Sequence, residues 1–178
     1  MGSDRLRYPQ ARRAVFQLKP LSPDALPAAV GKAERYRLLG EPAQAESICL
    51  DILAVDADHQ PAIVMLILAL TDQFRQRPGT HNQALDLVPR LAGDYERAYY
   101  SGLICERRAI AQSEQPGSGA AVAAREWLHD ALEHYAEAEP LRAAGNDDAI
   151  LRWNACVRLL ARLPAHEPSS DRSVLMLE

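Results

Sequence analysis

Apolar residues recur at intervals of three and four along most of the chain, which is the period of one face of an α-helix. Residues 22–39 show this spacing and end before Gly40, and residues 42–55 show it again. Pro42 stands in the first turn of the second segment, where its missing N–H breaks no hydrogen bond. Because only a short turn joins the two segments, the pattern predicts an antiparallel helix hairpin.

The run from Ala62 to Leu70 is apolar almost without interruption. Hydrophobicity alone also fits a buried strand, but the run continues as TDQFRQ among helical segments, so we predict a helix buried on nearly all sides. Pro89 must kink or end the next helix, since an interior proline costs about 3 kcal/mol. Helical spacing continues through residues 95–112, 120–139 and 146–163. The predicted fold class is all-α, with roughly six to eight helices stacked as antiparallel hairpins.

The first hairpin also has a pattern of large and small residues that returns 34 residues later. Its members are Ala29, Lys32, Ala33 and Tyr36 in one helix, Ala45 and Cys49 in the next, and then Ile63, Leu66, Ile67 and Leu70. The stretch AERYRLLGEPAQAESICLDILAVDADHQPA therefore resembles a tetratricopeptide repeat. Tyr36 and Ala45 match the repeat outright, Ala33 replaces its glycine with another small residue, and Ala57 stands where proline is usual.

The stretches RAYYSGL and RWNACVRLL resemble the openings of later, divergent first helices. Tyr99 and Trp153 are 54 residues apart, which exceeds one period, so the third unit carries an insertion that includes the loop at 115–119. Through EPAQAESICLDIL, LALTDQF, ERAYYSGLICERR and NDDAILRWN, the chain is also similar to a group of small bacterial tetratricopeptide-repeat proteins. The resemblance spans most of residues 22–163. It implies a right-handed solenoid whose first helices line a concave surface that grips a peptide or a partner helix.

The chain divides into three parts by composition and periodicity. Residues 1–21 lack sustained periodicity and are predicted to form a flexible arm, with Val15, Phe16 and Leu18 as a short apolar anchor. Residues 22–163 form the helical repeat domain. Residues 164–178 are a tail that is polar and then apolar, and it either docks on the body or stays exposed.

Charge and cysteine content narrow the function classes. A net charge of −4 argues against nucleic-acid binding, because neutralising phosphates requires concentrated Lys and Arg. No apolar run approaches the roughly 20 residues that a bilayer crossing needs, and the N-terminus has no apolar core of a signal peptide, so we expect a cytoplasmic protein without membrane contact. Its 3 cysteines are far apart in apolar segments and are predicted to be buried thiols.

Six polar or aromatic residues are candidates for partner binding. They are Tyr100, Glu106, Arg107, Arg152, Asn154 and Arg158. Tyr and Arg are enriched at binding hot spots, and an amide four residues from a guanidinium suits a peptide backbone or a carboxylate. The alternative is that the tyrosines are core residues and the charges form a solvated face or a buried pair. Trp153 is expected to pack beside Leu160.

The sequence offers little for catalysis. His129 and His134 are five residues apart and diverge around a helix, and Asp147 and Asp148 are more simply helix caps. We therefore predict no catalytic residue, cofactor or metal site. The expected function is a non-catalytic adaptor or scaffold that binds another protein or peptide. The alternative is a structural protein that forms homodimers through its repeat ends or its C-terminal tail.

Overall fold

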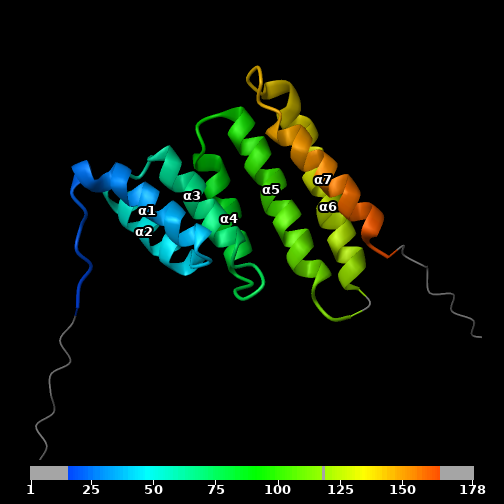
Figure 1. The fold of residues 1–178 in the computed structure, drawn as a ribbon, viewed down its shortest axis with the longest axis horizontal. Helices are drawn as coiled ribbons and strands as arrows, with labels where there is room; N and C mark the ends of the chain where they lie inside the picture. Colours follow the sequence, from blue (N-terminus) through cyan, green and yellow to red (C-terminus); the bar gives the residue numbers. More distant parts are fainter. Residues whose placement is uncertain (1–15, 118, 165–178) are drawn as a thin grey trace, which may run out of the picture.

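The computed structural model describes residues 16–117 and 119–164. Within these residues the chain is built from α-helices, with three short 3-10 turns and no strand (Figure 1). The helices are α1 (Leu26–Leu38), α2 (Pro42–Val55), α3 (Gln60–Thr71), α4 (Thr80–Leu87), α5 (Asp94–Ser113), α6 (Ala120–Ala138) and α7 (Asp148–Arg162). The 3-10 turns are η1 (Pro23–Ala25), η2 (Val88–Arg90) and η3 (Glu139–Leu141). The predicted all-α fold class is confirmed.

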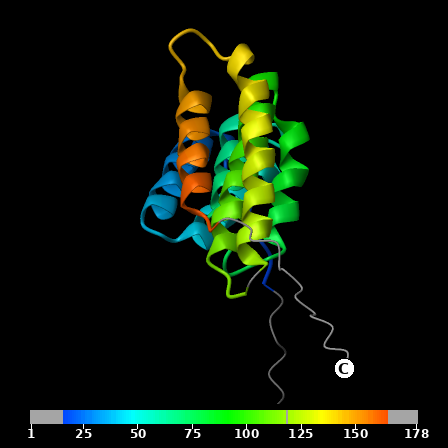
Figure 2. The same ribbon diagram turned by 90° about the vertical axis from the view of Figure 1, so that its right-hand side faces the viewer.

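Consecutive helices pack against each other along the whole row, and α7 packs on the α5–α6 hairpin. Every second helix is also in contact, since α1 touches α3, α3 touches α5 and α5 touches α7. The helix axes are roughly aligned, with consecutive helices running in opposite directions and α6 and α7 nearest the viewer in Figure 2. Each new hairpin is therefore stacked on the one before it, as in a repeat protein.

The ends of the helices follow from single residues. Gly40 has φ +77, a conformation that favours glycine, and it closes the α1–α2 turn. Pro89 lacks the N–H that a continuing helix needs, so α4 ends at Leu87 and the chain passes into η2. Of the two predicted effects of Pro89, the structure shows the early end.

The core has two main parts. The first surrounds α3, where Ile63, Leu66, Ile67 and Leu70 are buried among residues of α1, α2, α4 and α5. The second joins α5, α6 and α7. The run predicted as a nearly fully buried helix is α3, and that prediction is confirmed. The cysteines are all buried and unbonded, also as predicted.

The third helix pair is longer than the pairs before it. α5 and α6 have 20 and 19 residues, whereas α3 and α4 have 12 and 8. Most of the extra length predicted for this unit is therefore helix, and the loop after Ser113 contributes only a small part.

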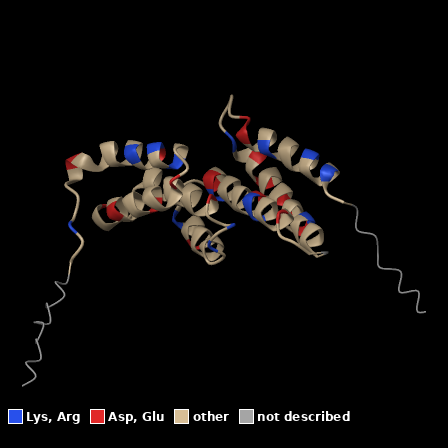
Figure 3. Cartoon of the chain, turned by 60° about the horizontal axis from the view of Figure 1, so that its bottom comes forward, with Lys and Arg blue, Asp and Glu red and all other residues tan. Residues whose placement is uncertain are grey.

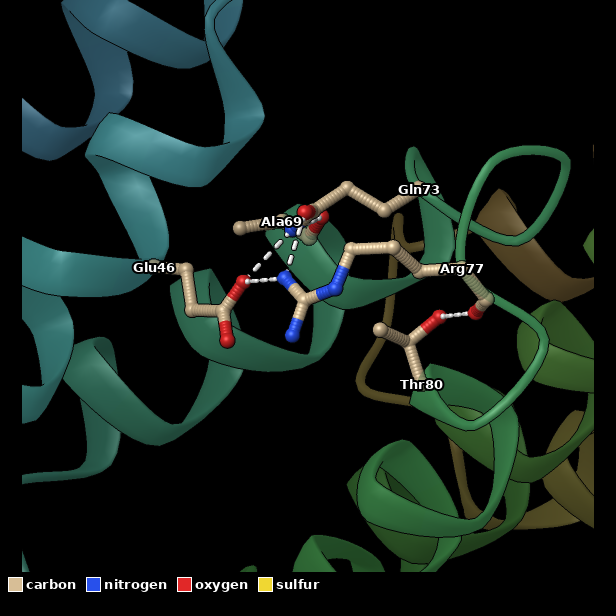
Figure 4. Close-up of polar contacts among 5 residues, drawn as sticks. All are labelled: Glu46, Ala69, Gln73, Arg77 and Thr80. Atoms are coloured by element: carbon tan, nitrogen blue, oxygen red, sulfur yellow. Dashed lines mark hydrogen bonds and ion pairs between the residues drawn. The ribbon is translucent and has the colours of Figure 1, made fainter.

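A polar cluster holds the loop between α3 and α4 (Figure 4). Gln73 Nε2 and Arg77 Nη1 donate to Glu46 Oε2 on α2 at 2.8 and 2.7 Å. Gln73 also donates to the carbonyl of Ala69, and Thr80 Oγ1 donates to the carbonyl of Arg77. These bonds fix one side of the loop against α2.

The N-terminal segment differs from the prediction. Phe16 and Leu18 are each 92% exposed, so they do not form an anchor. Leu21 packs instead against Leu26 and Ile52, because it lies next to the start of α1. Residues 1–15, which include Val15, and residues 165–178 lie outside the described residues.

Candidate partner-binding surface

Of the six candidate residues, the structure joins Glu106 and Arg152. Glu106 on α5 is only 5% exposed, and its Oε2 accepts a hydrogen bond of 2.6 Å from the Tyr135 hydroxyl on α6. Arg152 Nη1 on α7 donates to Glu106 Oε1 at 3.3 Å. The prediction that Glu106 contacts a partner is wrong, because its carboxylate is enclosed where three helices meet. Of the alternatives, a charged pair is what the structure shows, with Glu106 buried and Arg152 partly exposed.

Tyr135 reaches Glu106 because α5 has a glycine at the crossing point. A Cβ at Gly102 would lie 2.8 Å from Tyr135 Cε1, well inside van der Waals contact. Tyr135 is 1% exposed, so its ring fills the space that a side chain at position 102 would need. Gly102 therefore allows α5 and α6 to cross closely.

The charges at this junction support each other. Burial raises the pKa of Tyr135, and the adjacent Glu106 carboxylate raises it further, so the phenol stays protonated and donates. Burial lowers the pKa of Arg152, but the Glu106 charge together with Tyr99 and Tyr135 outweighs this effect, so the net change in its pKa is upward. The junction thus holds a neutral phenol, a carboxylate and a guanidinium, with the two charges compensating each other.

The tyrosines of α5 pack against one another. The rings of Tyr95 and Tyr99 stack with centroids 5.7 Å apart, and Tyr99 meets Tyr100 edge-on at 5.1 Å. Tyr99 belongs to the core shared with α6 and α7, whereas Tyr100 packs against the core around α3. Burial raises the pKa of Tyr100 to about 12. Tyr100 is thus mainly a packing residue with one partly exposed edge.

Arg107 lies on a partly exposed stripe of α5. Glu96, Tyr100, Leu103, Arg107 and Ile110 are spaced by three and four residues and share one helix face, which is partly exposed except at the buried Leu103. Tyr100 packs toward the core around α3, and its neighbour Tyr99 packs toward the core shared with α6 and α7. This face of α5 therefore lies between the side that packs on α3 and the side that packs on α7. Arg107 Nε is buried without an acceptor among the described residues. Arg107 therefore offers an uncompensated charge on this stripe.

Asn154 and Arg158 lie on the exposed side of α7, opposite the buried residues Ala149 and Cys156. Three apolar side chains on the same helix are also exposed, namely Leu151 (64%), Val157 (45%) and Trp153 (37%). Leu160 packs in the core as expected, but Trp153 does not. The reason is that α7 is the last described helix, so none of the other described helices covers this side.

Basic residues occur on α1, α5 and α7. Lys and Arg mark α1 and α7, which stand on the same side of the molecule with α3 and α5 between them (Figure 3). Arg37 on α1 is already paired, at 2.6 Å, with Asp72 at the end of α3. On α7, Arg152 is likewise paired with Glu106, so part of the positive charge at both ends of the row is compensated.

Sequence reasoning missed the close crossing at Gly102, the hydrogen bond of Tyr135 to Glu106, and the surroundings of His81. His81 on α4 is 9% exposed and lies between Phe74 and Trp127, with ring centroids 5.5 and 5.0 Å away. A glycine inside a long helix was the one available signal of a close helix crossing. The contacts of His81 depend on the packing of α4 on α5 and α6, which no local pattern encodes.

Comparisons of this chain with protein-family models, with curated proteins and with solved structures find no match. Among the described residues, the helices are all too short or too polar to cross a bilayer.

Proposed function

We propose that this chain is a non-catalytic, tetratricopeptide-like adaptor that binds a peptide or helix of another cytoplasmic protein along α1, α3, α5 and α7. The observation that carries the proposal is the contact of α1 with α3, α3 with α5 and α5 with α7. Alternate helices that touch in series form a continuous surface, which is how helical repeat proteins hold extended partners.

The side chains along this surface suggest the chemistry of the partner. Val64 and Leu68 on α3 and Tyr100 on α5 are partly buried and offer apolar contact. Arg107 shares the α5 face of Tyr100 and has no ion pair among the described residues. A partner segment with apolar residues would bury the apolar side chains on α3 and α5, and a carboxylate on that segment would neutralise Arg107.

Photo-crosslinking combined with mutagenesis tests this proposal. A photoreactive residue at Leu68 should capture a partner from the source cytoplasm, whereas one at Leu85, on the exposed side of α4, should not. Capture at Leu68 should be lost on Arg107→Ala and kept on Arg142→Ala, because Arg142 is paired with Glu139 in the α6–α7 connection. Equal capture from both positions, or capture that is insensitive to Arg107→Ala, would refute the proposed surface.

A second candidate is self-association through α7. Exposed Leu151, Trp153 and Val157 form an apolar side on the last described helix, and uncapped repeat ends tend to pair. Solution mass should then exceed that of one chain and fall on Leu151→Glu with Val157→Glu. Removing residues 165–178 separates a contribution of the tail from one of the helix. A monomer in every case would exclude this candidate.

A further inference from the structure

A hollow of about 380 Å³ lies between the α3–α4 loop and the last turns of α5. Its lining residues are Phe74, Arg75, Pro78, Arg108, Ala111, Gln112 and Gln115. Arg108 follows Arg107 directly, so the two side chains leave the helix about 100° apart. The hollow is therefore separate from the surface to which Arg107 belongs.

Arg108 is the unusual residue in this hollow. Its Nε is buried without an acceptor, and the described residues give its guanidinium neither an ion pair nor a hydrogen bond. Arg107 shares this feature on another face of α5, whereas Arg37 has Asp72, Arg152 has Glu106, and Arg125 has the carbonyl of Leu163 as acceptors. A partly buried guanidinium without an acceptor is unfavourable unless a further group supplies one.

Arg108 supplies the net positive charge of the hollow, because the other charged groups nearby are paired or neutral. Arg75 Nε is 2.8 Å from Glu114 Oε2, and both side chains are largely exposed, so this pair is neutral as a unit. Burial lowers the pKa of His81, and the positive charge of Arg108 lowers it further, so His81 is neutral near pH 7. One positive charge suits a ligand with one negative charge.

The walls of the hollow are held in place. Gln73 and Arg77 bind Glu46 on one side of the α3–α4 loop (Figure 4), and Phe74, 3% exposed, anchors the other side. Gln112 and Gln115 add amide groups that can both donate and accept. A guanidinium beside amides resembles the groups that hold a carboxylate next to a peptide bond.

We infer that this hollow binds a carboxylate, with Arg108 as its ion-pair partner and the Gln112 and Gln115 amides as its hydrogen-bonding neighbours. A volume of about 380 Å³ is in the range of small-ligand sites. The carboxylate can belong to a small organic acid or to the C-terminus of a peptide. This inference does not rest on the adaptor function.

The test is a calorimetric titration of the full chain at constant ionic strength with three probes: propionate, acetyl-trialanine with a free carboxylate, and the same peptide as its C-terminal amide. We expect saturable binding of a free carboxylate and none of the amide. Arg108→Gln should weaken binding by about tenfold or more, because it removes a charge-assisted contact. Arg142→Gln, in the α6–α7 connection and outside both surfaces, is the control and should leave binding unchanged. Circular dichroism confirms that both variants are folded.

His81 gives an independent readout by NMR. A carboxylate beside Arg108 offsets the charge that helps to lower the pKa of His81, so a saturating probe should move that pKa upward. Tighter binding of the peptide acid than of propionate assigns the site to a peptide C-terminus, and equal binding assigns it to a small acid. No saturation by either acid at millimolar concentration, equal binding of the amide, or equal losses in the two arginine variants would overturn the inference.

Discussion

Replacing Gly102 with alanine tests the close crossing of α5 and α6. In the interior of a helix, alanine is more favourable than glycine by about 0.5–1 kcal/mol. At position 102 the new methyl group would lie 2.8 Å from Tyr135 Cε1. Overpacking of this kind costs about 1–3 kcal/mol. Subtracting the intrinsic gain from this cost, we expect Gly102→Ala to lower the free energy of unfolding by about 1 kcal/mol.

Gly31→Ala is the matched control, because Gly31 lies inside α1 and a Cβ added there would meet nothing within 4 Å. It should raise the free energy of unfolding by about 0.5–1 kcal/mol, so the two variants should differ by about 2 kcal/mol. Urea unfolding followed by circular dichroism measures both, with equal m-values required for the comparison. If Gly102→Ala stabilises the protein as much as Gly31→Ala, the Tyr135 ring does not occupy the space beside Gly102.

Three further predictions concern buried charges and thiols. Arg152→Leu leaves the enclosed Glu106 carboxylate with Tyr135 as its one partner and should lower the free energy of urea unfolding by about 2 kcal/mol. This is less than the loss of a fully buried pair, because Arg152 is partly exposed. A loss no larger than that of Arg142→Leu would contradict the pairing of Arg152 with Glu106. Burial raises the pKa of the three thiols, Cys49, Cys105 and Cys156, to about 12. A thiol reagent at pH 8 should therefore label the native chain far more slowly than the urea-unfolded chain. The stability that these thiols contribute should be lost as the pH rises from about 9 to about 12. Because folding lowers the pKa of His81 from 6.5, the stability that this residue contributes should be present above pH 6.5 and lost as the pH falls below it. His81→Phe should reduce the drop in unfolding free energy between pH 7.5 and 5.5. An unchanged drop would show that His81 does not titrate differently in the folded chain.

The helices could be predicted well from the sequence because each depends on local information. The spacing in residues 42–55, the apolar run that forms α3 and the stop at Pro89 are properties of neighbouring residues. The candidate site was harder to predict. Glu106 looked like a surface charge, because nothing near it in sequence shows that Tyr135 and Arg152, 29 and 46 residues away, enclose its carboxylate.

The exposure of Trp153 on α7 could not be predicted for a related reason. Trp153 was expected to pack because large aromatic residues usually do, but packing also needs a neighbouring element on that side. Whether such an element exists is a property of the whole row of helices. The same limit applies to Arg108, whose surroundings come from a loop more than 25 residues earlier in the chain.

The contacts between neighbouring and alternate helices also determine how the chain should fold. Every extensive contact between helices joins elements that are close in the chain order, so the contact order of the described residues is low. Chains of this kind fold quickly, because little loop-closure entropy is lost before contacts form. They can also open in parts. The α1–α2 hairpin, at one end and held mainly by α3, should exchange its amide hydrogens well before the long α5–α6 hairpin does.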